Sequence, residues 1–265
     1  MKRIAFIGCG NMAKAMIGGI IKKGVASPEE VIASNRSSKN LEYAKQTWNI
    51  AVTPDNKEAA RGAELLVLAV KPQFYSQVIE EIREVVTEDQ IVMSIAPGKT
   101  LAWLEEQFGK PLKLVRANPN TPALVGEGVT SVSFGSRLSE AERAGVMEIL
   151  ESFGKASETP ESMSEAVIAV SGSAPAYVFM FIEALADGAV SLGMPRAQAY
   201  EFASQAVLGA AKMVQETGLH PGALKDMVCS PGGTTIQAVR VLEERGFKSS
   251  VIEAMTACAE KAKGM

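Results

Sequence analysis

The chain has 265 residues, of which 47% are hydrophobic, 22% charged and 6% aromatic. This composition is typical of a globular protein and excludes extensive disorder, and the length suits one large domain or two modest ones. The net charge of −3 argues against binding to nucleic acid, which needs a basic face. The single histidine, His220, excludes a metal site built from several histidines.

The cysteines and the apolar stretches predict a cytoplasmic protein. Cys9, Cys229 and Cys258 have no paired short spacing, so we expect neither a disulfide framework nor a zinc ribbon. The most apolar stretch, residues 173–192, is interrupted by two acidic residues, whereas a membrane span needs about 20 mostly apolar residues. We therefore expect no membrane association and a small molecule as the partner.

Residues 1–160 alternate between short apolar runs and longer stretches with helical spacing, which predicts a mostly parallel sheet with crossover helices. The expected strands are Ile4–Ile7, Val31–Ser34, Leu65–Val70, Ile91–Ile95, Leu112–Arg116 and Val129–Phe134. The clearest helices are expected at Asn11–Lys23, Phe74–Val86 and Ser139–Phe153.

Residues 161–265 contain no convincing strand and predict an all-helical domain. Two long alanine-rich stretches, Ala176–Leu192 and Arg196–Glu216, show few polar positions. A subunit interface that covers them is our preferred interpretation. The alternative is an all-helical core packed on the first domain.

A glycine-rich turn follows the first strand and opens the first helix, with the sequence Gly8-Cys9-Gly10-Asn11-Met12-Ala13. Gly8 suits a tight turn, and the missing Cβ of Gly10 would let a pyrophosphate approach the backbone. The helix start offers N–H groups and a favourable dipole to an anion. This context predicts a dinucleotide site, with a tight turn that binds nothing as the alternative. We expect Cys9 to be a small filler.

The second strand is followed by Asn35-Arg36-Ser37-Ser38-Lys39, which contains no acidic residue. NAD-binding folds usually place Asp or Glu here to bind the 2′-hydroxyl of the adenosine ribose. Arg36, the hydroxyls and Lys39 would instead suit a 2′-phosphate. The segment therefore favours NADP(H) over NAD(H), unless it is a solvated polar loop.

Further residues lie where the carboxyl ends of parallel strands form a ligand crevice. Val70 and Lys71 end the third strand, and Pro72 forces Lys71 into an extended conformation. Asn56 and the Ala96-Pro97 turn occupy similar positions, but their chemistry is generic. We interpret the loop Asn118–Pro122 as a rigid turn.

The helical half contains the segment Ser230-Pro231-Gly232-Gly233-Thr234-Thr235. Ser230 is predicted to cap a helix with Pro231 at its first position. Two glycines at a helix start would leave backbone amides open to a carboxylate, with two threonine hydroxyls beside them. The alternative is a capped helix with a flexible start. Ser171–Pro175 is predicted to be a second such start, and His220 to be a cap or a surface residue.

No histidine, cysteine pair or acid dyad is an evident general base. Oxidation of a hydroxyl usually needs a base such as His or Lys. Reduction of a carbon–nitrogen double bond needs less, because a protonated imine already accepts hydride readily once it is positioned.

Together these motifs resemble those of pyrroline-5-carboxylate reductase along essentially the whole chain. The likeness rests on Phe6–Ala13, Asp55-Asn56, Leu68–Gln73, Pro119–Pro122, Ser171–Tyr177 and Ser230–Thr235. The last two segments are specific to that family, whereas the first is shared by many dehydrogenases. The resemblance implies a Rossmann-type domain over residues 1–160 and an all-helical dimerisation domain over residues 161–265. It also implies a homodimer or a higher homo-oligomer.

The resemblance further implies reduction of L-1-pyrroline-5-carboxylate to L-proline, the last step of proline biosynthesis, with NADP(H) preferred and NAD(H) possible. Thr235 would hydrogen-bond the ring nitrogen and is the predicted catalytic residue. The residues expected to bind substrate are Ser230, Gly232, Gly233, Thr234 and Thr235. Those expected to contact the cofactor are Gly8, Gly10, Asn11, Met12, Asn35, Arg36, Asn56, Val70, Lys71, Pro72, Ala96 and Pro97.

Three positions depart from the usual pattern of the family. Asn118 stands in place of Met, Ala174 in place of Gly, and Pro97 in place of Ala. Ala174 adds a methyl group near the expected substrate. Two other functions stay open: a related imine or hydroxyacid reductase on the same fold, and a catalytically silent NADP-binding regulatory protein. The Gly-Gly-Thr-Thr segment argues against the hydroxyacid version, and the intact pair of threonines argues against the silent one.

Overall fold

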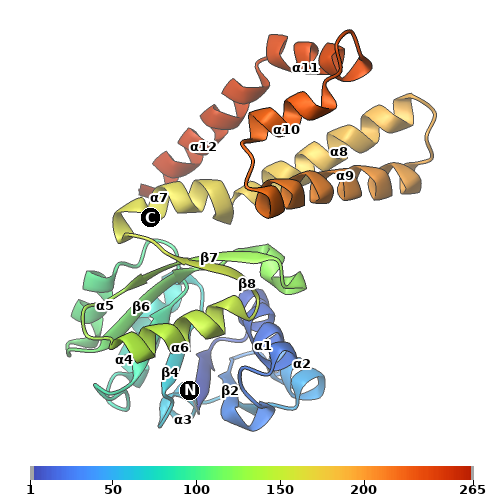
Figure 1. Cartoon of the computed structure of the whole chain (residues 1–265). Coiled ribbons are helices and arrows are strands. Elements are labelled where there is room, and N and C mark those ends of the chain that lie inside the picture. Colours follow the sequence, from blue (N-terminus) through green and yellow to red (C-terminus); the bar gives the residue numbers. More distant parts are fainter. Residues whose placement is uncertain (1–2, 264–265) are drawn as a thin grey trace. The chain divides into compact units, whose positions relative to one another are not determined.

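The computed structural model describes residues 3–263, which form two compact units (Figure 1). The first comprises residues 3–172 together with residues 258–263, and the second is Ser173–Ala257.

Among the described residues, the strands of the first unit form one eight-stranded sheet in the order β3-β2-β1-β4-β5-β6-β7-β8. Neighbouring strands are parallel except for the antiparallel pair β6–β7. The strands are β1 (Ile4–Ile7), β2 (Val31–Ser34), β3 (Ala51–Thr53), β4 (Leu65–Leu68), β5 (Ile91–Ser94), β6 (Lys113–Asn118), β7 (Gly128–Phe134) and β8 (Gly154–Glu158). The predicted mostly parallel sheet is confirmed, and β3 and β8 are additional strands.

Helices cover both faces of this sheet, because the buried strands are apolar on both sides. In β1, Phe6 packs into one core and Ile7 into the other. The first core includes residues of α1 (Asn11–Lys23), α2 (Ser38–Trp48) and α6 (Glu140–Glu151). The second includes residues of α3 (Asn56–Ala60), α4 (Tyr75–Ile82) and α5 (Leu101–Phe108) (Figure 1). A 3-10 helix (Glu161–Met163), α7 (Ser164–Val167) and a π-helix (Ile168–Gly172) follow β8.

The strand order changes sides at β1. The chain adds β2 and β3 on one side of β1 and then returns to add β4 and β5 on the other side. The register aligns Ile7 with both Ser34 and Leu68, so these three strands end at one level. The Gly8 N–H donates to the Ser34 carbonyl at 2.9 Å, and the Ala69 N–H donates to the Ile7 carbonyl at 2.8 Å. Such a switch point is where open α/β sheets bind their ligands.

The second unit is helical. Its helices are α8 (Ala174–Ser191), α9 (Arg196–Thr217), α10 (Pro221–Val228), α11 (Thr234–Glu244) and α12 (Phe247–Lys263), whose last residues are grouped with the first unit. Among the described residues of this unit, few side chains are buried: a small cluster of Ala186, Ala199 and Ala203, and Leu224 on α10. Large apolar side chains such as Phe179 and Met180 are more than 60% exposed.

His220 was predicted to be either a helix cap or a surface residue, and it caps α10. Its Nδ1 accepts a hydrogen bond from the Gly222 N–H at 3.0 Å.

Candidate functional site

A pocket of about 430 Å³ lies in the first unit at the carboxyl ends of β1, β2 and β4. Seven of the twelve residues predicted to contact a cofactor line it. They are Gly8, Gly10, Asn35, Arg36, Asn56, Val70 and Lys71. These residues come from separate parts of the chain, and the ends of the aligned strands bring them together.

The two glycines of the turn are required for different reasons. Gly8 has φ +100, and a Cβ there would lie 2.7 Å from the carbonyl oxygen of Ala69, so the fold itself demands glycine. Gly10 has φ −80 and ψ −173, which any residue can adopt, and a Cβ would meet no protein atom within 4 Å. Nothing in the fold demands a glycine at position 10, and the space beside its backbone is open to a ligand.

The amino end of α1 is free to receive an anion. Gly10 is the N-cap residue, no side chain caps the helix, and its first turn has no acidic residue. The Asn35 Oδ1 accepts from the Cys9 N–H at 3.2 Å, which fixes the turn to the end of β2. Burial raises the pKa of the Cys9 thiol, so this side chain stays neutral and fills space.

Two cationic side chains line the pocket. The Arg36 guanidinium lies over the Phe74 ring, with its central carbon 4.4 Å from the ring centroid. Lys71 has φ −65 and ψ 147, which confirms the extended conformation predicted from Pro72. Pro72 itself begins the 3-10 helix Pro72–Phe74. The lining of the pocket therefore includes two positive charges, which would favour an anionic ligand.

Asn56 is held by both ends of its amide. Its Oδ1 accepts from the Ser34 Oγ at 2.7 Å, and its Nδ2 donates to the Glu81 Oε2 at 2.9 Å. The residue opens α3 beside Asp55, whose carboxylate accepts from the N–H groups of Lys57 and Glu58 and caps that helix. The loop after β3 therefore presents Asn56 in one orientation.

The other predicted cofactor residues do not line this pocket. Asn11 borders a separate groove of about 920 Å³, and Met12 packs against the first core. Ala96 is buried, and its N–H donates to the Ser94 Oγ at 3.4 Å. Pro97 follows Ala96 in the loop after β5.

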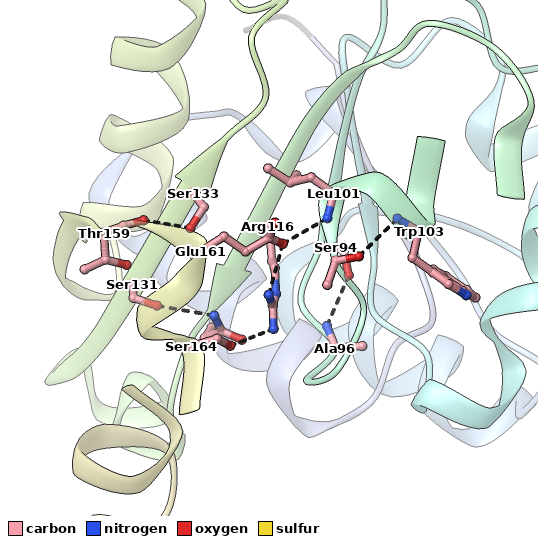
Figure 2. Close-up of polar contacts among 12 residues, drawn as sticks. Ser94, Ala96, Leu101, Trp103, Arg116, Ser131, Ser133, Thr159, Glu161 and Ser164 are labelled. Atoms are coloured by element: carbon pink, nitrogen blue, oxygen red, sulfur yellow. Dashed lines mark hydrogen bonds and ion pairs between the residues drawn. The ribbon is translucent and has the colours of Figure 1, made fainter. Parts of the chain in front are cut away.

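An ion pair between the buried Arg116 and the half-buried Glu161 joins β6 to the start of α5 and to the segment after β8 (Figure 2). Arg116, which is 4% exposed, contacts the Glu161 carboxylate at 3.0 Å and donates to the Ser164 Oγ at 2.6 Å. The same Glu161 oxygen accepts from the Leu101 N–H at 2.9 Å, at the start of α5. Its partners give Arg116 a role in joining three elements of the first unit.

The predicted turn Asn118–Pro122 is confirmed only in part, because Asn118 ends β6 and a 3-10 helix (Thr121–Val125) begins within the segment. Asn120 is buried, its Oδ1 accepts from the Val129 N–H at 2.9 Å, and its Nδ2 donates to the Ser171 carbonyl at 3.0 Å. Asn118 ends β6 and donates to the Ser131 Oγ at 3.3 Å.

The predicted helix start at Ser230 is wrong in detail. The helix α11 begins at Thr234 with Gly233 as its N-cap residue. Gly232 has φ +70, a left-handed conformation that ends any helical course from Ser230, and the Gly233 N–H donates to the Ser230 carbonyl at 3.0 Å. Ser230, Pro231 and Gly232 thus form a turn, and the open amides belong to the first turn of α11 rather than to both glycines.

The revised helix start keeps the chemistry of an anion site. No side chain caps α11, its first turn has no acidic residue, and the Thr235 side chain is half-buried. The first N–H groups of a helix have no partner within it. The second predicted start also shifts, because Ser171 and Gly172 lie in a π-helix and α8 begins at Ala174.

Sequence reasoning missed two important pocket residues. Phe74 comes three residues after Lys71, and an aromatic residue so near a predicted cofactor contact was a usable signal. Glu81 lies on α4, and only the packing of α4 against α3 brings it to the end of β2.

Comparison with known proteins agrees with this architecture. The family model described as "Pyrroline-5-carboxylate reductase dimerisation" matches residues 161–265, and "NADP oxidoreductase coenzyme F420-dependent" matches residues 3–98. The pyrroline-5-carboxylate reductase of Escherichia coli is 52% identical over 98% of this chain and 97% of its own length. This chain belongs to the pyrroline-5-carboxylate reductase family.

Solved structures of family members have the same fold. The pyrroline-5-carboxylate reductase of Coxiella burnetii has a TM-score of 0.93 at 37% identity and covers 99% of this chain and 98% of its own. The Plasmodium falciparum pyrroline carboxylate reductase, solved with NADP bound, has a TM-score of 0.89 at 31% identity, covering 99% of this chain and 97% of its own.

Family membership also explains the apolar surface of the helical half. The helical run Glu161–Ser191 contains an 18-residue stretch with a mean hydropathy of 1.5, which is apolar enough to cross a membrane by length and composition alone, and only 6% of that stretch is buried. The same residues fall within the match to the dimerisation family, so a second subunit accounts for these exposed side chains.

Proposed function

We propose that this protein is a cytoplasmic pyrroline-5-carboxylate reductase that converts L-1-pyrroline-5-carboxylate to L-proline, with NADPH preferred over NADH. The observation that carries the proposal is the 52% identity to the E. coli pyrroline-5-carboxylate reductase, which extends over nearly the whole of both chains. The partners proposed are this small substrate and a second copy of the chain, without nucleic acid or membrane.

The residues of the first unit fit a dinucleotide. Open space beside the Gly10 backbone and the uncapped start of α1 suit a pyrophosphate. Arg36 and Lys71 add positive charge to the same pocket, which suits the 2′-phosphate of NADP. When bound, the nicotinamide supplies the hydride that reduces the imine carbon.

The residues of the α11 start suit the substrate. We propose that the first-turn amides of α11 bind its carboxylate, with the Thr234 hydroxyl beside them. The Thr235 hydroxyl would hydrogen-bond the ring nitrogen and orient the C=N bond for hydride addition. The protonated imine is already electrophilic and already carries its N–H proton, so hydride addition to the carbon gives the amine directly. These residues therefore need only position the ring.

Kinetics of variants at the α11 start test this proposal. Thr235→Ala should lower kcat by about 10- to 100-fold, as loss of one positioned hydrogen bond does, while NADPH binds with unchanged Kd. Thr235→Ser keeps the hydroxyl and should retain most of the activity, and Thr234→Ala should raise KM more than it lowers kcat. Full activity of Thr235→Ala would remove the proposed role of that hydroxyl.

A further inference from the structure

A carboxylate reaches the dinucleotide pocket from an unexpected element. Glu81, on α4, lines this pocket, and its Oε2 accepts from the Asn56 Nδ2 at 2.9 Å. The Asn56 Oδ1 in turn accepts from the Ser34 Oγ at 2.7 Å, and Ser34 is the last residue of β2. Two hydrogen bonds therefore join the Glu81 carboxylate to the end of β2.

The end of β2 is where dinucleotide-binding sheets select between the two nicotinamide cofactors. A carboxylate there accepts a hydrogen bond from the 2′-hydroxyl of NAD, and its negative charge repels the 2′-phosphate of NADP. The segment after β2 carries Arg36 and no acid. In the folded chain an acid from α4 nevertheless lies in this pocket. The pocket therefore contains one group that favours NADP, Arg36, and one that favours NAD, Glu81.

We propose that Glu81 is a specificity-determining residue, whose charge limits the preference for a 2′-phosphate that Arg36 confers. This inference rests on the proposed function, because it assumes that the pocket binds the adenosine end of a nicotinamide cofactor. Glu81 and Arg36 then act in opposite directions on the same phosphate.

The hydrogen bonds also give Glu81 a positioning effect on Asn56. The amide is oriented with Nδ2 toward Glu81 and Oδ1 toward Ser34. Glu81→Gln keeps a carbonyl oxygen that can accept from Asn56 but removes the charge. Glu81→Ala removes both the charge and the hydrogen bond, so the two variants separate the two effects.

Equilibrium binding of two cofactor fragments tests the charge effect without catalysis. Adenosine 2′,5′-bisphosphate and 5′-AMP differ only in the 2′-phosphate, and isothermal titration calorimetry gives the Kd of each. In Glu81→Gln the ratio of the 5′-AMP Kd to the bisphosphate Kd should rise about tenfold, an effect typical of one unit charge beside a phosphate. Glu81→Ala should raise the ratio similarly, and Arg36→Ala should lower it.

Glu80→Gln is the matched control. Glu80 lies next to Glu81 on α4, is exposed and pairs with Arg83 at 3.0 Å, so its neutralisation changes the net charge equally outside the pocket. Its ratio should stay at the wild-type value. An equal rise in Glu80→Gln, or no rise in Glu81→Gln, would overturn the assignment of Glu81.

The failures of the two proposals are distinguishable. Two fragments that bind to the unaltered protein, with a ratio that Glu81 variants do not move, reject Glu81 alone. If neither fragment binds to the unaltered protein, the dinucleotide pocket is wrong, and both the inference and the proposed function fall.

Discussion

Replacing Gly10 with alanine should separate cofactor binding from folding. Gly10 has φ −80 and ψ −173, and an added Cβ meets no protein atom within 4 Å. Alanine lowers the entropy of the unfolded chain but is a poorer N-cap residue than glycine, and these terms oppose each other. The free energy of unfolding should therefore change by less than about 1 kcal/mol.

The same methyl group would occupy the space beside the backbone that we assign to the pyrophosphate. We expect the Kd for NADPH to rise at least tenfold, which corresponds to about 1.4 kcal/mol. Urea unfolding followed by circular dichroism measures stability, and fluorescence titration with NADPH measures affinity.

Gly8→Ala is the contrasting variant. Gly8 has φ +100, and its Cβ would lie 2.7 Å from the Ala69 carbonyl oxygen. Backbone strain and the steric clash should together cost at least about 2 kcal/mol of stability.

The result that would refute this reasoning concerns the first variant. Wild-type NADPH affinity in a folded Gly10→Ala protein would refute the assignment of this turn to the pyrophosphate.

Two further predictions concern charged groups of the first unit. Arg116→Met leaves the half-buried Glu161 carboxylate with the Leu101 N–H but without its 3.0 Å ion-pair partner. It should lower the free energy of unfolding in urea titrations by about 2 kcal/mol, the contribution of a hydrogen bond to a charged group, with partial recovery in Arg116→Met/Glu161→Gln. A loss below about 1 kcal/mol would contradict this. Hydrogen bonds from Lys113 and from the Ser139 backbone lower the pKa of the Glu142 carboxyl below its usual 4.5. Its stabilisation is therefore present above pH 4.5 and lost as the pH falls through the folded-state value. In Glu142→Gln the free energy of unfolding should fall less steeply as the pH is lowered through the acidic range, with a total difference from the wild type of less than about 1 kcal/mol. The same pH dependence in both proteins would contradict the assignment.

The buried strands were predictable because their pattern is simple. Leu65–Leu68 is apolar at every position, as a parallel strand covered on both faces must be. The edge strands β3 and β8 were not, because β3 has only three residues and β8 is largely exposed and polar. Local composition cannot reveal such strands, since their neighbours define them.

The site was predictable where a motif and its structural context coincide, and only there. Gly8 and Gly10 carry their signal in six consecutive residues. The start of α11 was predicted four residues too early. Ser230-Pro231 is a typical helix start, and the sequence alone does not show that Gly232 adopts φ +70 and ends such a helix. Glu81 was out of reach, because its place beside Asn56 depends on how α3 and α4 pack.

The most direct test follows the reaction to its product. Purified protein is incubated with NADPH and L-1-pyrroline-5-carboxylate, and the NADPH consumed and the L-proline formed are both measured. We predict one L-proline for each NADPH oxidised, with no oxidation when the substrate is omitted. A protein that binds NADPH but forms no L-proline would contradict the account.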